Sequence, residues 1–169
     1  MGTGHELGQP VKDGSGLRRV RRRVLLAHDA STVTCNPLVD ALEGAFRSVD
    51  IVESSSVQDA QDALRTSLLD PDAPVFGPRF DVCMVCLDLP PAPLGGVRVA
   101  QEALRCGLPV VLVTRSLRWI PPSAAALREL PWVTPDATAA EVERAVAEAL
   151  AAFAAAEVDD EAAAHAASG

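Results

Sequence analysis

A near-continuous apolar run extends from Val82 to Leu87 and leads into a loop rich in proline and glycine that ends at Gly96. The length and β-branched content of this run are typical of a strand buried on both faces. Such a strand usually lies at the centre of a parallel sheet, where the loop that leaves its carboxyl end carries the functional residues. Residues 86–90 are therefore the first place to look for chemistry.

Other apolar segments predict four more strands and five helices. The helix starts have a local cause: in Asn36-Pro37 the asparagine caps the helix and proline lacks only a donor that would be unpaired there, and Thr138 with Glu141 forms a capping box. The predicted strands are Val24–Ala27, Val49–Glu53, Pro109–Thr114 and Pro131–Thr134. The predicted helices are Asn36 to about Arg47, Ser56 to Leu68, Gly96 to Arg105, Ser123 to about Leu130, and Thr138 to about Ala156.

Strands that alternate with helices predict an α/β fold, because right-handed crossovers place helices on both faces of a parallel sheet. We expect a five-stranded parallel sheet of order 2-1-3-4-5 in a flavodoxin-like, three-layer sandwich. The 169 residues suffice for one such domain. Its expected bounds are 22–156, between a disordered leader at 1–21 that ends in arginines and an acidic, alanine-rich tail at 157–169.

Charge and cysteine content narrow the function. A net charge of −8 argues against a nucleic-acid-binding body, and no apolar run approaches the length of a membrane helix. Four cysteines without a signal peptide are typical of reduced thiols. We therefore expect a cytoplasmic protein that binds neither membranes nor, directly, nucleic acid.

Several short motifs in the right order resemble the receiver domain of response regulators, nearest in character to receivers of LuxR-type regulators. They cover about residues 22–155 and read VLLAHDA, DVCMVCLDLP followed by GGVRVAQEAL, LPVVLVTRS, and PWVTPDATAAEVERAVAEAL. The resemblance implies a CheY-like signalling module of a two-component phosphorelay. Active receivers use an acidic pair to hold Mg²⁺, a phosphoacceptor aspartate, a hydroxyl and a lysine.

On these positions the chain departs from the family pattern. The acidic pair falls on His28 and Asp29, the hydroxyl on Thr114 and the lysine on Pro135. No lysine follows Lys12, so the missing ammonium cannot be recovered by shifting the alignment. The acceptor falls on Cys86 when Leu89-Pro90 is aligned with the family's Leu-Pro; Asp88 would serve only if the strand were two residues longer.

The favoured prediction is a degenerate receiver, or pseudo-receiver, that acts by protein contact without aspartyl phosphorylation. We expect no enzymatic activity, no cofactor and no metal site, and a signalling protein or a second copy as partner. The resemblance implies a contact surface over the fourth helix, fifth strand and fifth helix, including Trp119, Ile120 and Trp132. Exposed tryptophans favour interfaces.

Two alternatives remain open. The first is a phosphorylatable receiver that uses Asp88 with Asp29 and Mg²⁺. The second is a small nucleotide- or flavin-binding protein, which the chain supports poorly because ASTVTCNP, and no glycine-rich phosphate loop, follows the first strand. Cys83 and Cys86 form a C-x-x-C pattern, but in a strand positions three apart point to opposite faces, so core packing is expected.

Overall fold

The computed structural model describes residues 21–29, 36–69 and 80–166. The predicted leader, apart from Arg21, lies outside the described residues. Cys35 and the loop predicted from Asp70 to Pro78 lie outside them too. Within the described residues, no helix is both long and apolar enough to cross a lipid bilayer.

Five strands form one sheet of order β2-β1-β3-β4-β5, and every neighbouring pair is parallel. This arrangement confirms the predicted fold class and strand order. β3 lies at the centre and all five of its residues are buried. The strands are β1 (Arg22–Ala27), β2 (Val49–Ser54), β3 (Val82–Cys86), β4 (Val110–Val113) and β5 (Trp132–Val133).

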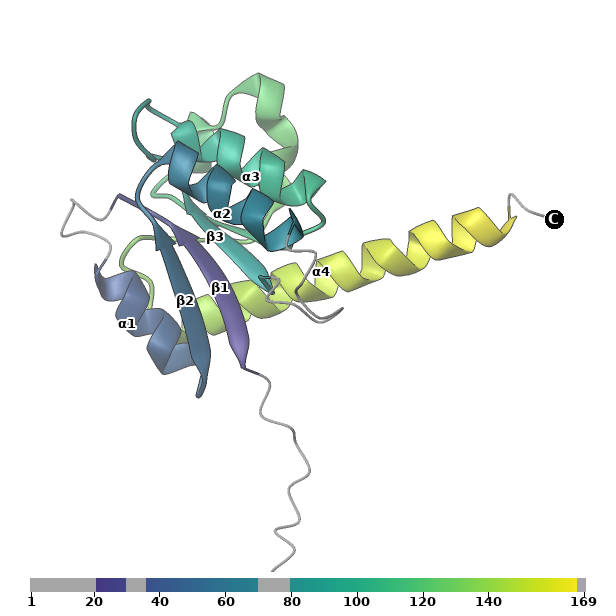
Figure 1. The fold of residues 1–169 in the computed structure, drawn as a ribbon, viewed down its shortest axis with the longest axis horizontal. Helices are drawn as coiled ribbons and strands as arrows, with labels where there is room; N and C mark the ends of the chain where they lie inside the picture. Colours follow the sequence, from purple (N-terminus) through teal and green to yellow (C-terminus); the bar gives the residue numbers. More distant parts are fainter. Residues whose placement is uncertain (1–20, 30–35, 70–79, 167–169) are drawn as a thin grey trace, which may run out of the picture.

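Helices cover both faces of the sheet (Figure 1). α1 (Asn36–Ala45) and α4 (Ala139–Ala166) pack on one face, and α2 (Val57–Leu69) and α3 (Gly95–Arg105) pack on the other. Alternate residues of β3 supply the two cores: Met84 faces α1 and α4, whereas Val85 faces α2 and α3. The central strand therefore contributes side chains to both apolar cores, one on each face of the sheet.

The crossover between β4 and β5 differs from the prediction. It contains two 3₁₀ segments, η2 (Leu117–Trp119) and η3 (Pro122–Glu129). The short helix predicted from Ser123 to about Leu130 is η3, and its N-cap is Pro121 instead of Ser123. Pro121 and Pro122 lack backbone donors, and Ala124 has non-helical dihedral angles, so the segment does not continue as an α-helix. The described residues thus contain four α-helices.

The last helix is longer than predicted. α4 continues to Ala166, so the predicted tail from Glu157 begins inside a helix. Alanine has the highest helix propensity, and neither glycine nor proline occurs between residues 136 and 168. The carboxyl-terminal part of α4 extends away from the sheet (Figure 1).

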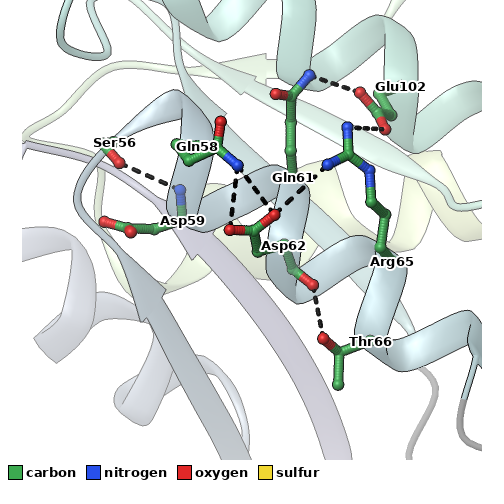
Figure 2. Close-up of polar contacts among 8 residues, drawn as sticks. All are labelled: Ser56, Gln58, Asp59, Gln61, Asp62, Arg65, Thr66 and Glu102. Carbon is green, nitrogen blue, oxygen red and sulfur yellow. Dashed lines mark hydrogen bonds and ion pairs between the residues drawn. The ribbon is translucent and has the colours of Figure 1, made fainter.

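Polar side chains join α2 to α3 (Figure 2). Gln61 Nε2 donates to Glu102 Oε2 at 2.6 Å, and Arg65 forms an ion pair of 3.7 Å with the same carboxylate. Ser56 accepts a hydrogen bond of 3.1 Å from the backbone N–H of Asp59 and so caps α2. The two contacts to Glu102 link α2 to α3 beside the apolar core.

The loop after β3 returns closely onto the strand it leaves. The backbone N–H of Gly96 donates to Leu87 O at 3.0 Å. A Cβ atom at Gly95 would overlap the carbonyl oxygen of Leu89, and one at Gly96 would overlap that of Cys86. Glycine at both positions lets the first turn of α3 approach the end of β3.

We expect Gly96→Ala to lower the free energy of unfolding by about 3 kcal/mol or more, because the added methyl group meets backbone atoms that cannot move independently. Urea denaturation followed by far-ultraviolet circular dichroism measures the change. The matched control is Gly107→Asn. Gly107 has a φ of +71°, and a Cβ atom there would meet only the Phe153 ring, at an ordinary contact distance of 3.8 Å. Asparagine tolerates that backbone conformation, so its cost should stay below about 1 kcal/mol. Equal losses for both variants would contradict the close-approach argument.

The predicted capping box at the start of α4 is present. Glu141 Oε2 accepts hydrogen bonds of 2.8 Å from both the backbone N–H and the hydroxyl of Thr138, and Thr138 Oγ1 accepts from the backbone N–H of Glu141 at 3.4 Å. The bonds from the Thr138 backbone and then from its side chain lower the pKa of Glu141 below its usual value of 4.5.

Because the folded pKa of Glu141 is depressed, its carboxylate stabilises the fold above pH 4.5 and loses that effect as the pH falls through the folded pKa. We therefore expect Glu141→Gln to be less stable than the parent chain at neutral pH. The difference should shrink as the pH falls below 4.5. Urea denaturation at a series of pH values measures it, and a difference that is independent of pH would contradict the role of the charge.

Candidate functional site

The predicted pocket residues follow four neighbouring strands at the carboxyl edge of the sheet. His28 and Asp29 follow β1, Asp88 lies two residues after the end of β3, Thr114 follows β4, and Pro135 follows β5. Parallel strands end at the same edge, so the topology brings these segments together. The individual side chains, however, enter different environments.

His28 is almost fully buried and lies against the end of β2. Its Nε2 is 2.6 Å from Glu53 Oε2, and its backbone N–H donates to Ser54 O at 2.9 Å. The exposed fraction is 2% for the His28 side chain and 52% for that of Glu53. The contact is a hydrogen bond when the ring is neutral and an ion pair when it is protonated.

Glu53 is a partner of His28 that the sequence patterns did not predict. The strand order could have indicated this pairing. With β1 beside β2 and Leu26 paired with Glu53, a residue two positions after Leu26 shares the face of Glu53 and lies within side-chain reach.

Cys86 is the last residue of β3 and its side chain is buried in the core under α1 and α4. Cys83 is buried in the opposite core, under α2 and α3. The two thiols of the C-x-x-C pattern therefore point away from each other, as strand alternation predicts. Burial, and then the nearby Cys106, raise the pKa of Cys83 to about 12, which keeps this thiol protonated at neutral pH.

Asp88 is exposed and stands between two buried leucines, Leu87 and Leu89. β3 ends at Cys86, two residues before it, and the following backbone turns so that Leu89 N–H donates to Leu87 O at 3.1 Å. Among the residues that the structure describes, no group of three or more histidine, cysteine, aspartate or glutamate side chains is arranged to hold a metal ion.

The hydroxyl of Thr114 is engaged with its own loop. Thr114 Oγ1 donates to Ser116 O and accepts from Ser116 N–H, both at 3.1 Å, and the residue is buried. Pro135 is half-buried in the turn between β5 and α4. Beside it, a hydrogen bond from the Thr134 side chain, together with smaller effects that include the Arg115 charge, lowers the pKa of Asp136.

Two of the three residues predicted to form a contact surface are exposed. Trp119 is 49% exposed and Trp132 is 42% exposed, but Ile120 is only 1% exposed and packs in the core under α2 and α3. The prediction that Ile120 belongs to a contact surface is therefore wrong, because the turn after η2 directs it inward. Trp132 lines a hollow of about 470 Å³ beside β5, together with Arg128, Arg144 and Glu148.

The chain matches no protein-family model, and no curated protein matches it. Solved structures do match its fold. The N-terminal domain of a response regulator/sensory box/GGDEF 3-domain protein from Carboxydothermus hydrogenoformans aligns with a TM-score of 0.61 at 16% identity, over 79% of this chain and 98% of that one. A response regulator receiver protein from Sinorhizobium medicae aligns with a TM-score of 0.58 at 20% identity, over 79% and 97%.

The fold is that of a receiver domain. A CheY-like receiver domain from Methylobacillus flagellatus agrees, with a TM-score of 0.57 and 16% identity over 77% of this chain and 99% of that one. At these identities the likeness concerns the receiver fold alone. The residues at the carboxyl edge must therefore be judged by their own chemistry.

We expect Glu53→Ala to lower the free energy of unfolding by about 1 kcal/mol, because it removes the carboxylate that pairs with a buried imidazole nitrogen. Urea denaturation at neutral pH measures the loss. Glu43→Ala is the matched control, since Glu43 is an exposed glutamate on α1, and its effect should stay below about 0.5 kcal/mol. The pairing would be energetically unimportant if the two variants were equally stable.

Proposed function

We propose that the chain is a receiver-like signalling module that acts through protein contact, without phosphorylation of an aspartate. The receiver fold supports a signalling role at the coarse level. The observation that carries the finer proposal is the end of β3, where the resemblance implies a phosphoacceptor carboxylate and the chain has the buried thiol of Cys86.

The neighbouring positions support the same proposal. Where the resemblance implies the first carboxylate of an acidic pair, His28 is buried against Glu53. Where it implies a lysine, Pro135 supplies no cation and no backbone donor. Transfer of a phosphoryl group needs Mg²⁺ and a cation to neutralise the phosphoryl oxygens, so we propose no enzymatic activity, no cofactor and no resident metal.

Partner and location belong to this proposal as well. We infer a signalling protein or a second copy of this chain as partner, with Trp119 and Trp132 as contact residues, because half-exposed tryptophans are enriched where proteins bind one another. A cytoplasmic location, the absence of direct nucleic-acid binding, and the likeness to LuxR-type receivers stay predictions.

One observation favours a second function. Asp88 is exposed in the loop after β3, at the same edge of the sheet as Asp29, and so is accessible to a phosphodonor. A receiver that is phosphorylated on Asp88 with Mg²⁺ held by Asp29 is therefore the alternative. Binding of a nucleotide or flavin has no such support, since most of the loop after β1 lies outside the described residues.

Incubation with acetyl phosphate and Mg²⁺, followed by intact-mass spectrometry, separates the two functions. We expect no gain of a phosphoryl group under conditions in which an active receiver protein, treated in parallel, is modified. A gain that disappears in Asp88→Asn but persists in Asp81→Asn would establish the alternative and overturn the proposed function. Asp81 is a suitable control because it lies before β3, at the opposite edge of the sheet.

A further inference from the structure

Arginines gather where β1 begins. Arg21 precedes the strand and Arg22 is its first residue, and the backbone N–H of Arg22 donates to Ser48 O at 3.1 Å. This bond brings Arg47, the residue before Ser48, beside the same strand end. We call Arg21, Arg22 and Arg47 the basic corner. It lies at the amino edge of the sheet, opposite the edge that Asp88 follows.

The basic corner has no ionic partner within the part of the chain that the structure describes. Two of its side chains are exposed and the third is half-buried, and none of the three guanidinium groups forms an ion pair there. The neighbouring Arg23 differs, since it pairs with Asp50 at 3.4 Å and lies over the ring of Phe80. Its backbone N–H also donates to Asp81. The acids of the adjoining strands therefore contact Arg23 and leave the basic corner uncompensated.

The sequence around the basic corner has the same sign of charge. Residues 14–28 contain five arginines and neither aspartate nor glutamate, whereas the whole chain has a net charge of −8. The acids of α1, Asp40 and Glu43, are exposed and form no ion pair with Arg47 in the described residues. A strongly positive region thus exists in a chain that is acidic elsewhere.

The end of α4 carries the opposite charge. The helix packs on the sheet as far as Leu150, and the alanines at 154–156 are exposed. From Ala154 to Ala166 it continues for about 20 Å. No lysine or arginine follows Arg144. Four acids fall within five residues of this projecting part, and we call them the acidic end: Glu157, Asp159, Asp160 and Glu161.

The acidic end is unfavourable in a helix that has no partner. Positions 157, 160 and 161 have the spacing i, i+3 and i+4, at which like charges destabilise a helix. A helical segment of this length is also only marginally stable in water unless it packs on something. Cations supplied from outside the helix would offset the repulsion, and the basic corner offers three of them.

We propose that the acidic end of α4 binds the basic corner of a second copy of the chain, and that the contact is reciprocal. In Figure 1 the end of α4 lies apart from the start of β1, so one copy does not join its own two charged regions. In a two-fold dimer each contact occurs twice. The inference rests on the proposed function only in taking a second copy as partner, and it involves neither tryptophan nor Asp88.

Sedimentation velocity of the full chain tests the proposal. At about 100 μM protein and about 50 mM NaCl we expect a dimer, and we expect it to dissociate as NaCl is raised to about 500 mM, because exposed ion pairs are screened by salt. A chain that stays monomeric at the lower salt concentration would overturn the inference. A dimer that is insensitive to salt would overturn it as well.

Charge reversal locates the contact. Arg47→Glu should weaken dimerisation by about tenfold or more, since it replaces an attractive charge with a repulsive one. Arg98→Glu makes the same change in net charge on the exposed side of α3 and should alter dimerisation by less than about twofold. Asp160→Arg should weaken dimerisation although it makes the chain less negative. Equal effects of Arg47→Glu and Arg98→Glu would show that the basic corner is not the contact.

A mixture of the Arg47→Glu and Asp160→Arg variants gives the sharpest test. In the mixed dimer one contact joins the two altered side chains, which again have opposite charges, and the other contact is unaltered. We therefore expect the mixture to dimerise more strongly than either variant alone at the same total concentration. Circular dichroism of each variant checks that it is folded. A mixture that associates no better than its components would refute the reciprocal contact.

Two further outcomes separate this inference from its alternatives. If the chain is monomeric but binds phosphatidylglycerol vesicles through Arg47, the basic corner recognises a lipid surface and the dimer contact is wrong. If acetyl phosphate modifies Asp88 in a chain that dimerises as expected, the proposed function fails and the contact stands. A monomeric chain that acetyl phosphate leaves unmodified refutes the dimer alone.

Discussion

The burial of β3 on both faces is the constraint on which the rest of the structure depends. All five of its residues are buried, so each face of the sheet must be covered by helices with apolar stripes. The strand also fixes the position of α3, because Gly96 brings the first turn of that helix against the carbonyl groups at the end of β3. The residues of β3 and the glycine that packs against its end therefore determine both the packing of the core and the position of the first turn of α3 at the carboxyl edge.

That dependence explains the unusual composition of the edge. An active receiver needs carboxylates and a cation where strands end, and such charges are costly to bury unless they are paired. Two of the residues at those positions are buried: Cys86 packs as a small apolar side chain, and His28 Nε2 has Glu53 as its partner. At Cys86 and His28 the apolar core thus extends to the carboxyl end of the strands, whereas Asp88 beside them is exposed.

Much of the fold was predictable because its signals are local. The apolar run at 82–87, the Asn36-Pro37 start and the Thr138 and Glu141 capping box each have a cause within a few residues, and the structure confirms the strand order that they imply. What failed depends on tertiary contacts. The burial of Ile120 follows from how a 3₁₀ turn meets the core, and the pairing of Glu53 with His28 follows from register between strands that are separated in sequence.

The placement of the aromatic side chains has a practical consequence for spectroscopy. The chain has two tryptophans and no tyrosine, and both indoles are about half-exposed, on η2 and β5. Because these indoles already contact water in the native state, unfolding would shift the wavelength of their emission little. Intrinsic fluorescence of this protein therefore reports the surroundings of η2 and β5 and is a poor indicator of whether the molecule is folded.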